Sequence, residues 1–284
     1  MIQMFVAIFV RDGNVRNGWW AAAFLALIAA LLGPAIILSA RFGHEITMLD
    51  QALIITLATV VIQMLRRRPV SEVTGRLDLR WLRQLGFGAA LGTLLMAAPA
   101  AVLTIGGWIF WEAGQARPET LIDAVLLMAG VAVAEELLFR GVLFQRLIAA
   151  VGVWPAQVAL GLLFVLTHLD NPGMDGATRL WAGANIFAAS LLFGMAFVRT
   201  RSLALPIGLH FMANVVQGVV LGFGVSGEAE PSLLAPQFLS ASEWLTGGAF
   251  GLEASLPGLI TVGILLAASI LLPRSGSEKA GGAA

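Results

Sequence analysis

The sequence contains no cysteine and no tyrosine, and only three of its 284 residues are histidine. Without cysteine, disulfides, thiol nucleophiles and thiolate-bound metals are excluded, although the redox compartment is not revealed. Without tyrosine, one common proton and hydrogen-bond donor is missing. Any chemistry must therefore depend on Glu, Asp and Arg together with His44, His168 and His210.

Charged residues are also scarce, at 12% of the chain, whereas hydrophobic residues reach 58%. Soluble domains carry about 25% charged residues. A water-facing surface cannot be built from half that supply, so most of the outer surface must face lipid. The formal net charge is zero, so nothing suggests nucleic-acid binding. These proportions predict an all-α bundle of transmembrane helices, with the lipid bilayer as its surroundings.

Eight apolar segments reach or approach the roughly 20 residues that a spanning helix needs. Each is bounded by charged residues, Gly or Pro, and several have Trp near an end, where interfacial anchors are expected. The eight predicted segments are approximately Trp19–Ala40, Ile46–Leu65, Leu85–Trp111, Leu121–Ala150, Trp154–Leu169, Leu180–Val198, Leu203–Val225 and Ala254–Leu272.

The arginines and lysines give this eight-span bundle an orientation. Thirteen of the 17 lie at the termini and in alternate connections, including the basic segment 66–84, and three lie in the other connections. Positive charge accumulates on the cytoplasmic side of a membrane protein. Both termini are therefore predicted to be cytoplasmic, and the 226–253 loop external. We expect one integral membrane domain over residues 1–284, with a disordered tail at 273–284.

The fourth segment places Glu135, Glu136 and Arg140 in an otherwise apolar helix. Each charge costs about 2.5–3.5 kcal/mol at the centre of a membrane helix on insertion scales, so it needs a partner or a function. Glu136 and Arg140 are four residues apart and share a helix face, which predicts an ion pair. Glu135 points about 100° away and is left to face something else. The simpler structural interpretation is a pair that locks two helices together, with Glu135 protonated.

Two later apolar segments also carry polar residues. His168 lies at the end of the fifth segment, and the seventh segment has a polar stripe. In this stripe His210, Asn214 and Gln217 are spaced at i, i+4 and i+7 on one face. An isolated histidine in a helix is more often a hydrogen-bonded core residue than a catalyst, but both of these belong to one small polar set. Helix rise places Glu135, Asn214 and both histidines at a similar depth. We expect them to converge on one water-filled cavity reached from the cytoplasmic side.

Together these residues make the chain resemble the CPBP family of intramembrane proteases, which includes the type II CAAX prenyl endopeptidases and the bacterial Abi-type bacteriocin-immunity proteins. The family motifs EExxxR, FxxxH and HxxxN occur here in order, as Glu135–Arg140, Phe164–His168 and His210–Asn214. One EExxxR motif alone is a weak signal, whereas three ordered motifs on separate apolar segments are a strong one. The resemblance covers about residues 120–220, which form the motif-bearing core.

The resemblance implies hydrolysis of a peptide bond inside the bilayer, in a membrane-associated peptide or protein. Glu135 and His168 would activate water. His210 and Asn214 would complete the site, and the Glu136–Arg140 pair would orient Glu135. The implied site residues are thus Glu135, Glu136, Arg140, His168, His210 and Asn214.

Metal dependence is open in this family, which is usually called a metalloprotease family but for which a metal-free glutamate mechanism has also been proposed. Glu135, His168 and His210 offer an O/N/N ligand set for zinc or another divalent metal. Without a metal, a buried glutamate can act as the general base, and His210 and Asn214 would stabilise the oxyanion. The HExxH motif is absent, so the metal assignment depends on the resemblance alone.

Two other functions stay open. A transporter or proton relay also uses intramembrane Glu, His and Arg, although the sequence contains no visible repeat or paired broken helices. A catalytically idle scaffold or immunity protein would share the same fold. Bacterial relatives suggest the bacterial inner (plasma) membrane as the location. Eukaryotic relatives trim prenylated C-terminal tripeptides, but nothing in the sequence indicates a prenyl pocket or an oligomeric state.

Overall fold

The computed structural model describes residues 10–11, 14–43, 45–239 and 241–273. This part of the chain is predominantly helical with two short strand pairs, which confirms the predicted all-α bundle. His44 and residues 274–284 of the predicted disordered tail lie outside the described residues.

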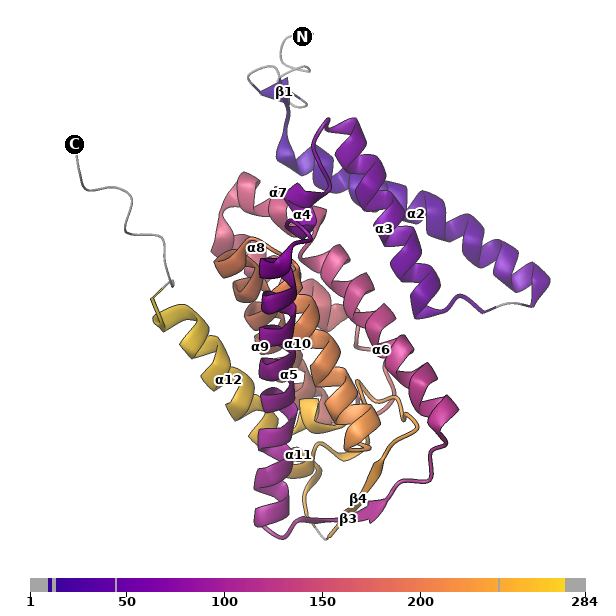
Figure 1. The fold of residues 1–284 in the computed structure, drawn as a ribbon, viewed down its shortest axis with the longest axis vertical. Coiled ribbons are helices and arrows are strands. Elements are labelled where there is room, and N and C mark those ends of the chain that lie inside the picture. Colours follow the sequence, from indigo (N-terminus) through magenta and orange to yellow (C-terminus); the bar gives the residue numbers. More distant parts are fainter. Residues whose placement is uncertain (1–9, 12–13, 44, 240, 274–284) are drawn as a thin grey trace.

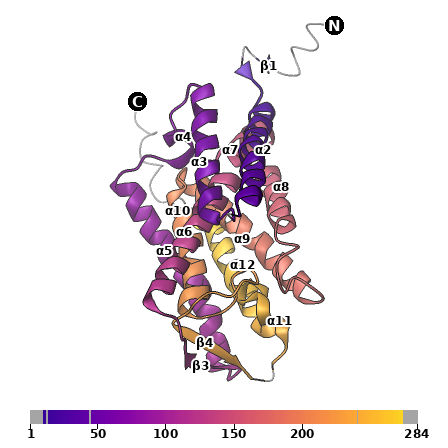
Figure 2. The ribbon, with the colours of Figure 1, turned by 90° about the vertical axis from the view of Figure 1, so that its right-hand side faces the viewer.

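Most of the longer helices form a bundle whose axis runs vertically in Figures 1 and 2, whereas the first long helix slants away from this axis in Figure 1. The longer helices are α2 (Asn17–Phe42), α3 (Met48–Leu65), α5 (Leu79–Ile105), α6 (Pro118–Phe139), α7 (Val142–Val151), α8 (Val153–Leu166), α9 (Thr178–Thr200), α10 (Ala204–Asn214) and α12 (Leu256–Leu271). The chain continues from α10 directly into the π-helical turn η1 (Val215–Val220).

Short elements close the two ends of the bundle. They are β1 (Val10–Arg11), β2 (Asn14–Val15), α4 (Ser71–Thr74), β3 (Ile109–Ala113), β4 (Leu234–Phe238), α11 (Glu243–Thr246), and the 3-10 turns η2 (Gly248–Phe250) and η3 (Leu252–Ala254). Strands β3 and β4 pair antiparallel, in register from Ile109 opposite Phe238 to Ala113 opposite Leu234. This ribbon lies at the opposite end of the bundle from α7 (Figures 1 and 2).

Each of the eight predicted apolar segments contains helix in the described residues. Helices α2, α3, α5 and α9 are long and apolar enough to cross a membrane, and α8, α12 and α10 with η1 are shorter apolar helices. Large apolar side chains such as Ile37, Leu53 and Ile264 point outward and are more than half exposed. Such a surface fits lipid contact. The helical architecture is therefore confirmed, whereas the number of crossings stays a prediction.

The fourth segment is not the single helix that the sequence predicted. Helix α6 ends at Phe139 and α7 begins at Val142, so Arg140 caps a helix end instead of lying within a continuous span. Gly141 permits the break, because a Cβ at this position would overlap the backbone carbonyl of Leu137. The break leaves the two glutamates in the last turns of α6.

Helices α5 and α10 pack closely through glycines. A Cβ on Gly88 or Gly92 of α5 would overlap the backbone carbonyls of Leu205 and Leu209 on α10, and a Cβ on Gly208 would meet α5 in the same way. Small residues at four-residue spacing allow membrane helices to approach to backbone contact. This contact fixes α10, which carries two of the predicted site residues.

We expect Gly92→Ala to destabilise the protein by about 1–3 kcal/mol, as is typical of overpacking, because the added methyl group must push α10 away. Gly86→Ala is the matched control, since a Cβ on this residue of α5 meets nothing within 4 Å and alanine improves helix propensity. Thermal unfolding in detergent measures both effects. Equal stabilities of the two variants would show that the close approach is not required.

Candidate active site

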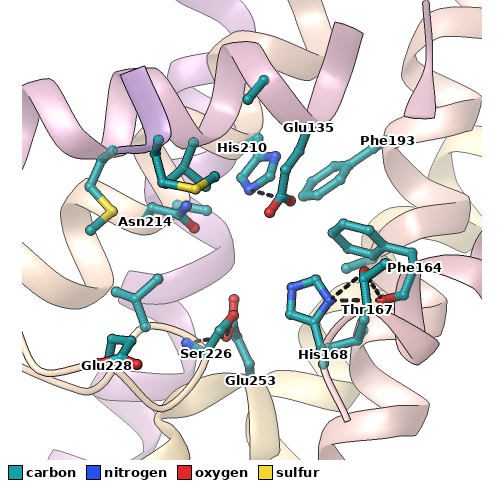
Figure 3. A pocket seen from close by; sticks show the side chains of 18 of the residues that line it. Glu135, Phe164, Thr167, His168, Phe193, His210, Asn214, Ser226, Glu228 and Glu253 are labelled. Atoms are coloured by element: carbon teal, nitrogen blue, oxygen red, sulfur yellow. Dashed lines mark hydrogen bonds and ion pairs between the residues drawn. The ribbon is translucent and has the colours of Figure 1, made fainter. Parts of the chain in front are cut away.

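A cavity of about 450 Å³ lies where α3, α5, α6, α8, α9 and α10 meet. Four of the predicted site residues come together in its lining, from three motifs that are far apart in the sequence. Figure 3 shows their side chains directed into the same space. These four residues are Glu135, His168, His210 and Asn214.

The predicted pair of Glu136 with Arg140 is present behind the cavity wall. Both side chains are buried, at 0% and 2% exposure, with 3.2 Å between Glu136 Oε1 and Arg140 Nη1. The guanidinium also donates from Nη2 to the backbone carbonyl and the Oγ of Ser190, at 2.9 and 2.8 Å. Its carbon lies 5.2 Å from the ring centres of both Phe164 and Phe193. Arg140 thereby ties α6 to α8 and α9.

His210 lies between the two glutamates. Its Nδ1 is 2.9 Å from Glu136 Oε1 and its Nε2 is 3.8 Å from Glu135 Oε2. Because the Glu136 carboxylate accepts, Nδ1 carries a proton, and Nε2 faces Glu135 and the cavity. The ring also stacks on Phe193, with centroids 4.9 Å apart and planes at 17°. Packing and hydrogen bonding together fix the orientation of the imidazole.

His168 lies in the turn that follows α8, and its own helix fixes its tautomer. Nδ1 is 2.7 Å from the backbone carbonyl of Phe164. A carbonyl can only accept, so Nδ1 donates and the neutral ring keeps an unprotonated Nε2. The Phe164 ring packs edge-on at 4.6 Å between centroids, and Figure 3 shows His168 facing Glu135 from the opposite side of the cavity.

Asn214 is the last residue of α10, where the chain passes into the π-helical turn η1. Such turns are frequent at functional sites because they redirect side chains. Asn214 is 4% exposed and lines the cavity, whereas Gln217 of the same predicted stripe donates to the backbone carbonyl of Gly224 at 2.7 Å. Because of the π-helical turn, Asn214 lines the cavity, whereas Gln217 points elsewhere and stabilises the loop at Gly224.

The order of these residues along the chain matches a known family. Residues 117–216 match the family model described as type II CAAX prenyl endopeptidase, Rce1-like. The chain carries an Rce1-like domain. This domain begins at the N-cap of α6, ends just beyond α10 and contains all three motifs, which confirms the predicted resemblance over about a third of the chain. A comparison with curated proteins found no match.

The Rce1-like domain and the apolar helices together indicate a multi-pass integral membrane protein with a CAAX-type protease domain. Sequence reasoning missed two residues of α9 that support its site, Ser190 and Phe193. Both lie in an apolar run in which a serine or a phenylalanine carries no distinctive signal. Their role depends on the tertiary approach of α9 to Arg140 and His210.

The three predicted metal ligands do not gather around one point. Glu135 and His210 are neighbours, whereas His168 faces them across the cavity of the Rce1-like domain (Figure 3). Among the described residues, no group of three or more His, Cys, Asp or Glu side chains is placed to hold a metal ion. Catalytic zinc usually has three protein ligands, so this arrangement does not fit a metal centre.

The remaining cavity wall comes from outside the Rce1-like domain. Ser226, Glu228 and Glu230 follow η1, and Glu253 belongs to η3. Asn171, in the loop after α8, donates to the backbone carbonyl of Ser226 at 3.0 Å and joins this wall to the domain. On the predicted topology this polar wall belongs to the external side. The expected entry from the cytoplasmic side stays a prediction.

Proposed function

We propose that the protein hydrolyses a peptide bond of a membrane-associated peptide or protein inside the bilayer, with a water molecule activated by Glu135 and His168. One observation carries the proposal: Glu136 is committed to Arg140 and His210, whereas Glu135 faces the cavity opposite His168. Among the described residues Glu135 has only the 3.8 Å approach of His210 Nε2. A carboxylate with so little structural commitment, beside a histidine with an unprotonated Nε2, is suited to general-base work. The Rce1-like match supports a protease of this class.

In the proposed reaction, water binds between the Glu135 carboxylate and Nε2 of His168. Glu135 takes the proton while the water oxygen forms a bond to the carbonyl carbon of the substrate. The carbonyl oxygen becomes an oxyanion, which accepts hydrogen bonds from the Asn214 amide and from Nε2–H of protonated His210. The carbon–nitrogen bond then breaks, and Glu135 returns the proton to the leaving amine.

Glu136 and Arg140 act in this proposal as positioning residues. Glu136 accepts from Nδ1 of His210 and thereby directs Nε2 to the cavity. Arg140 balances the charge of Glu136 and is itself held by Ser190. A reacting group held by packed, hydrogen-bonded neighbours needs little reorganisation during the reaction.

Comparison of new protein termini in two membrane preparations tests the proposal. One preparation contains the wild-type protein and the other contains Glu135→Gln at the same level. We expect cleavage sites within or beside apolar segments to appear only with the wild type. Identical sets of termini would contradict proteolysis and favour an idle scaffold or an immunity protein.

We expect proteolysis without a bound metal, because the three candidate ligands do not gather at one point. Elemental analysis of purified protein, combined with activity after chelation and after metal addition, measures this. Full activity in metal-stripped protein is the expected result. Stoichiometric zinc that is lost together with activity, and restores it on addition, would contradict the metal-free reaction.

A further inference from the structure

The cavity wall has a pronounced charge asymmetry. Four carboxylates line the cavity, whereas no Lys or Arg of the described residues does so. Arg140 is turned away into the protein, and its charge is taken up by Glu136. The four lining carboxylates are Glu135, Glu228, Glu230 and Glu253.

Glu253 is held in place at this wall. Its Oε2 accepts from the backbone N–H and from the Oγ of Ser226, at 2.9 and 3.0 Å. No hydrogen bond joins its Oε1 to another described residue, and Figure 3 shows the carboxylate directed into the cavity near His168. One oxygen is thus structural and the other is available to a ligand.

Glu228 and Glu230 continue the acidic wall on the loop after η1. Burial raises the pKa of Glu230, and the charge of Glu228 raises it further. No Lys or Arg of the described part of the cavity wall relieves their repulsion, and His210 is engaged with Glu135 and Glu136. A cation brought by a ligand would relieve it.

Asn214 gives a separate indication that the cavity receives a polar ligand. It is 4% exposed, its amide points into the cavity (Figure 3), and the described residues provide no hydrogen-bond partner for it. The amide is open to the cavity, so it is free to hydrogen-bond with a ligand there. A peptide group can both donate to it and accept from it, so a peptide in the cavity satisfies Asn214 while its charged side chains meet the acidic wall.

We propose that the cavity selects peptide segments with a Lys or Arg close to the cleaved bond and disfavours a free C-terminal carboxylate there. The inference rests on the proposed function and names its substrate class. Removal of a C-terminal tripeptide places the substrate carboxylate within about 11 Å of the cleaved bond, since a residue spans at most about 3.6 Å. Four carboxylates around the cavity repel such an end.

Three of the four carboxylates that line the cavity lie outside the part of the chain that resembles CAAX endopeptidases. Glu228, Glu230 and Glu253 follow the matched residues 117–216. The family match therefore carries no information about this wall. Its charge is a property of this chain's own loops, and it distinguishes an internal or basic segment from a carboxylate terminus.

Binding to the cleavage-deficient Glu135→Gln protein tests the inference without requiring turnover. The probes are two fluorescent peptides with one shared apolar segment and amidated C-termini, flanked by Lys-Lys or by Glu-Glu. A third carries Lys-Lys and a free carboxylate three residues beyond the apolar segment. At low salt we expect the amidated Lys-Lys peptide to bind at least about tenfold tighter than the Glu-Glu peptide, and tighter than the free-carboxylate peptide.

The preference for the Lys-Lys peptide over the Glu-Glu peptide should become smaller when carboxylates of the cavity wall are replaced in the Glu135→Gln protein. Glu228→Gln alters an exposed side chain and should reduce the preference without affecting folding, and Glu253→Gln should reduce it further. Glu119→Gln is the matched control, because it removes an exposed charge of α6 outside the cavity and should leave the preference intact.

Equal binding of the two amidated peptides, or an unchanged preference in folded Glu228→Gln and Glu253→Gln proteins, would overturn the inference. A Lys-Lys preference without cleavage of any peptide by the wild type would instead contradict the proposed protease function alone.

Discussion

Glu135→Gln should reduce proteolysis by at least about 10²–10⁴-fold, the usual contribution of a general base, while the protein stays folded in the membrane. The glutamine keeps the shape of the side chain but cannot take a proton from water. Glu135 has no ion-pair partner other than the 3.8 Å approach of His210 among the described residues, so little structure depends on its charge. Turnover of a cleaved substrate, measured beside thermal unfolding in detergent, gives both quantities.

Glu119→Gln serves as the control for removal of a negative charge from α6, because this residue is exposed and lies away from the cavity. It should keep wild-type turnover. If Glu135→Gln retained turnover within a few-fold of the wild type, the base would have to be another group.

Glu136→Gln should cost stability as well as activity. Removing one partner of a buried ion pair typically costs about 3–5 kcal/mol, because the other charge is left without compensation. Here the loss strands Arg140, which is 2% exposed, and weakens the hydrogen bond that orients His210. The two Ser190 contacts of Arg140 remain and offset part of the loss. Unfolding of Glu136→Gln and Glu135→Gln in detergent measures the difference in stability between the two variants.

A double-mutant cycle with Arg140→Met separates the pair from its surroundings. The double variant Glu136→Gln/Arg140→Met should be less destabilised than the sum of the two single variants, because it leaves no unpaired buried charge. If Glu135→Gln proved the more destabilising of the two glutamate variants, the roles of Glu135 and Glu136 would have to be exchanged.

The sequence predicted the features that depend on local periodicity. The pairing of Glu136 with Arg140 follows from i,i+4 spacing on a helix, and the same geometry separates Glu135 from it. Helix rise also placed His168 and His210 at a depth where both reach one cavity with Asn214. These relations are set within single helices, so they can be read from spacing.

The features that the sequence missed depend on contacts between distant elements. His210 binds Glu136, the glutamate assigned only to Arg140, because α10 approaches α6 on that side. The break after Arg140 depends on the single glycine Gly141 within a hydrophobic run, where a glycine is also compatible with a continuous membrane helix. The acidic wall with Glu253 arises when a loop folds back on the cavity, and no periodic pattern encodes that approach.

Cleavage in water enriched in oxygen-18 is the most direct measurement of water activation by Glu135. The purified protein, reconstituted in vesicles, is mixed with a substrate found by the comparison of termini, and the new C-terminus is analysed by mass spectrometry. Hydrolysis by an activated water predicts one oxygen-18 atom in the new carboxyl group with the wild type and no product with Glu135→Gln. Product without oxygen-18, or equal labelling by both proteins, would contradict it.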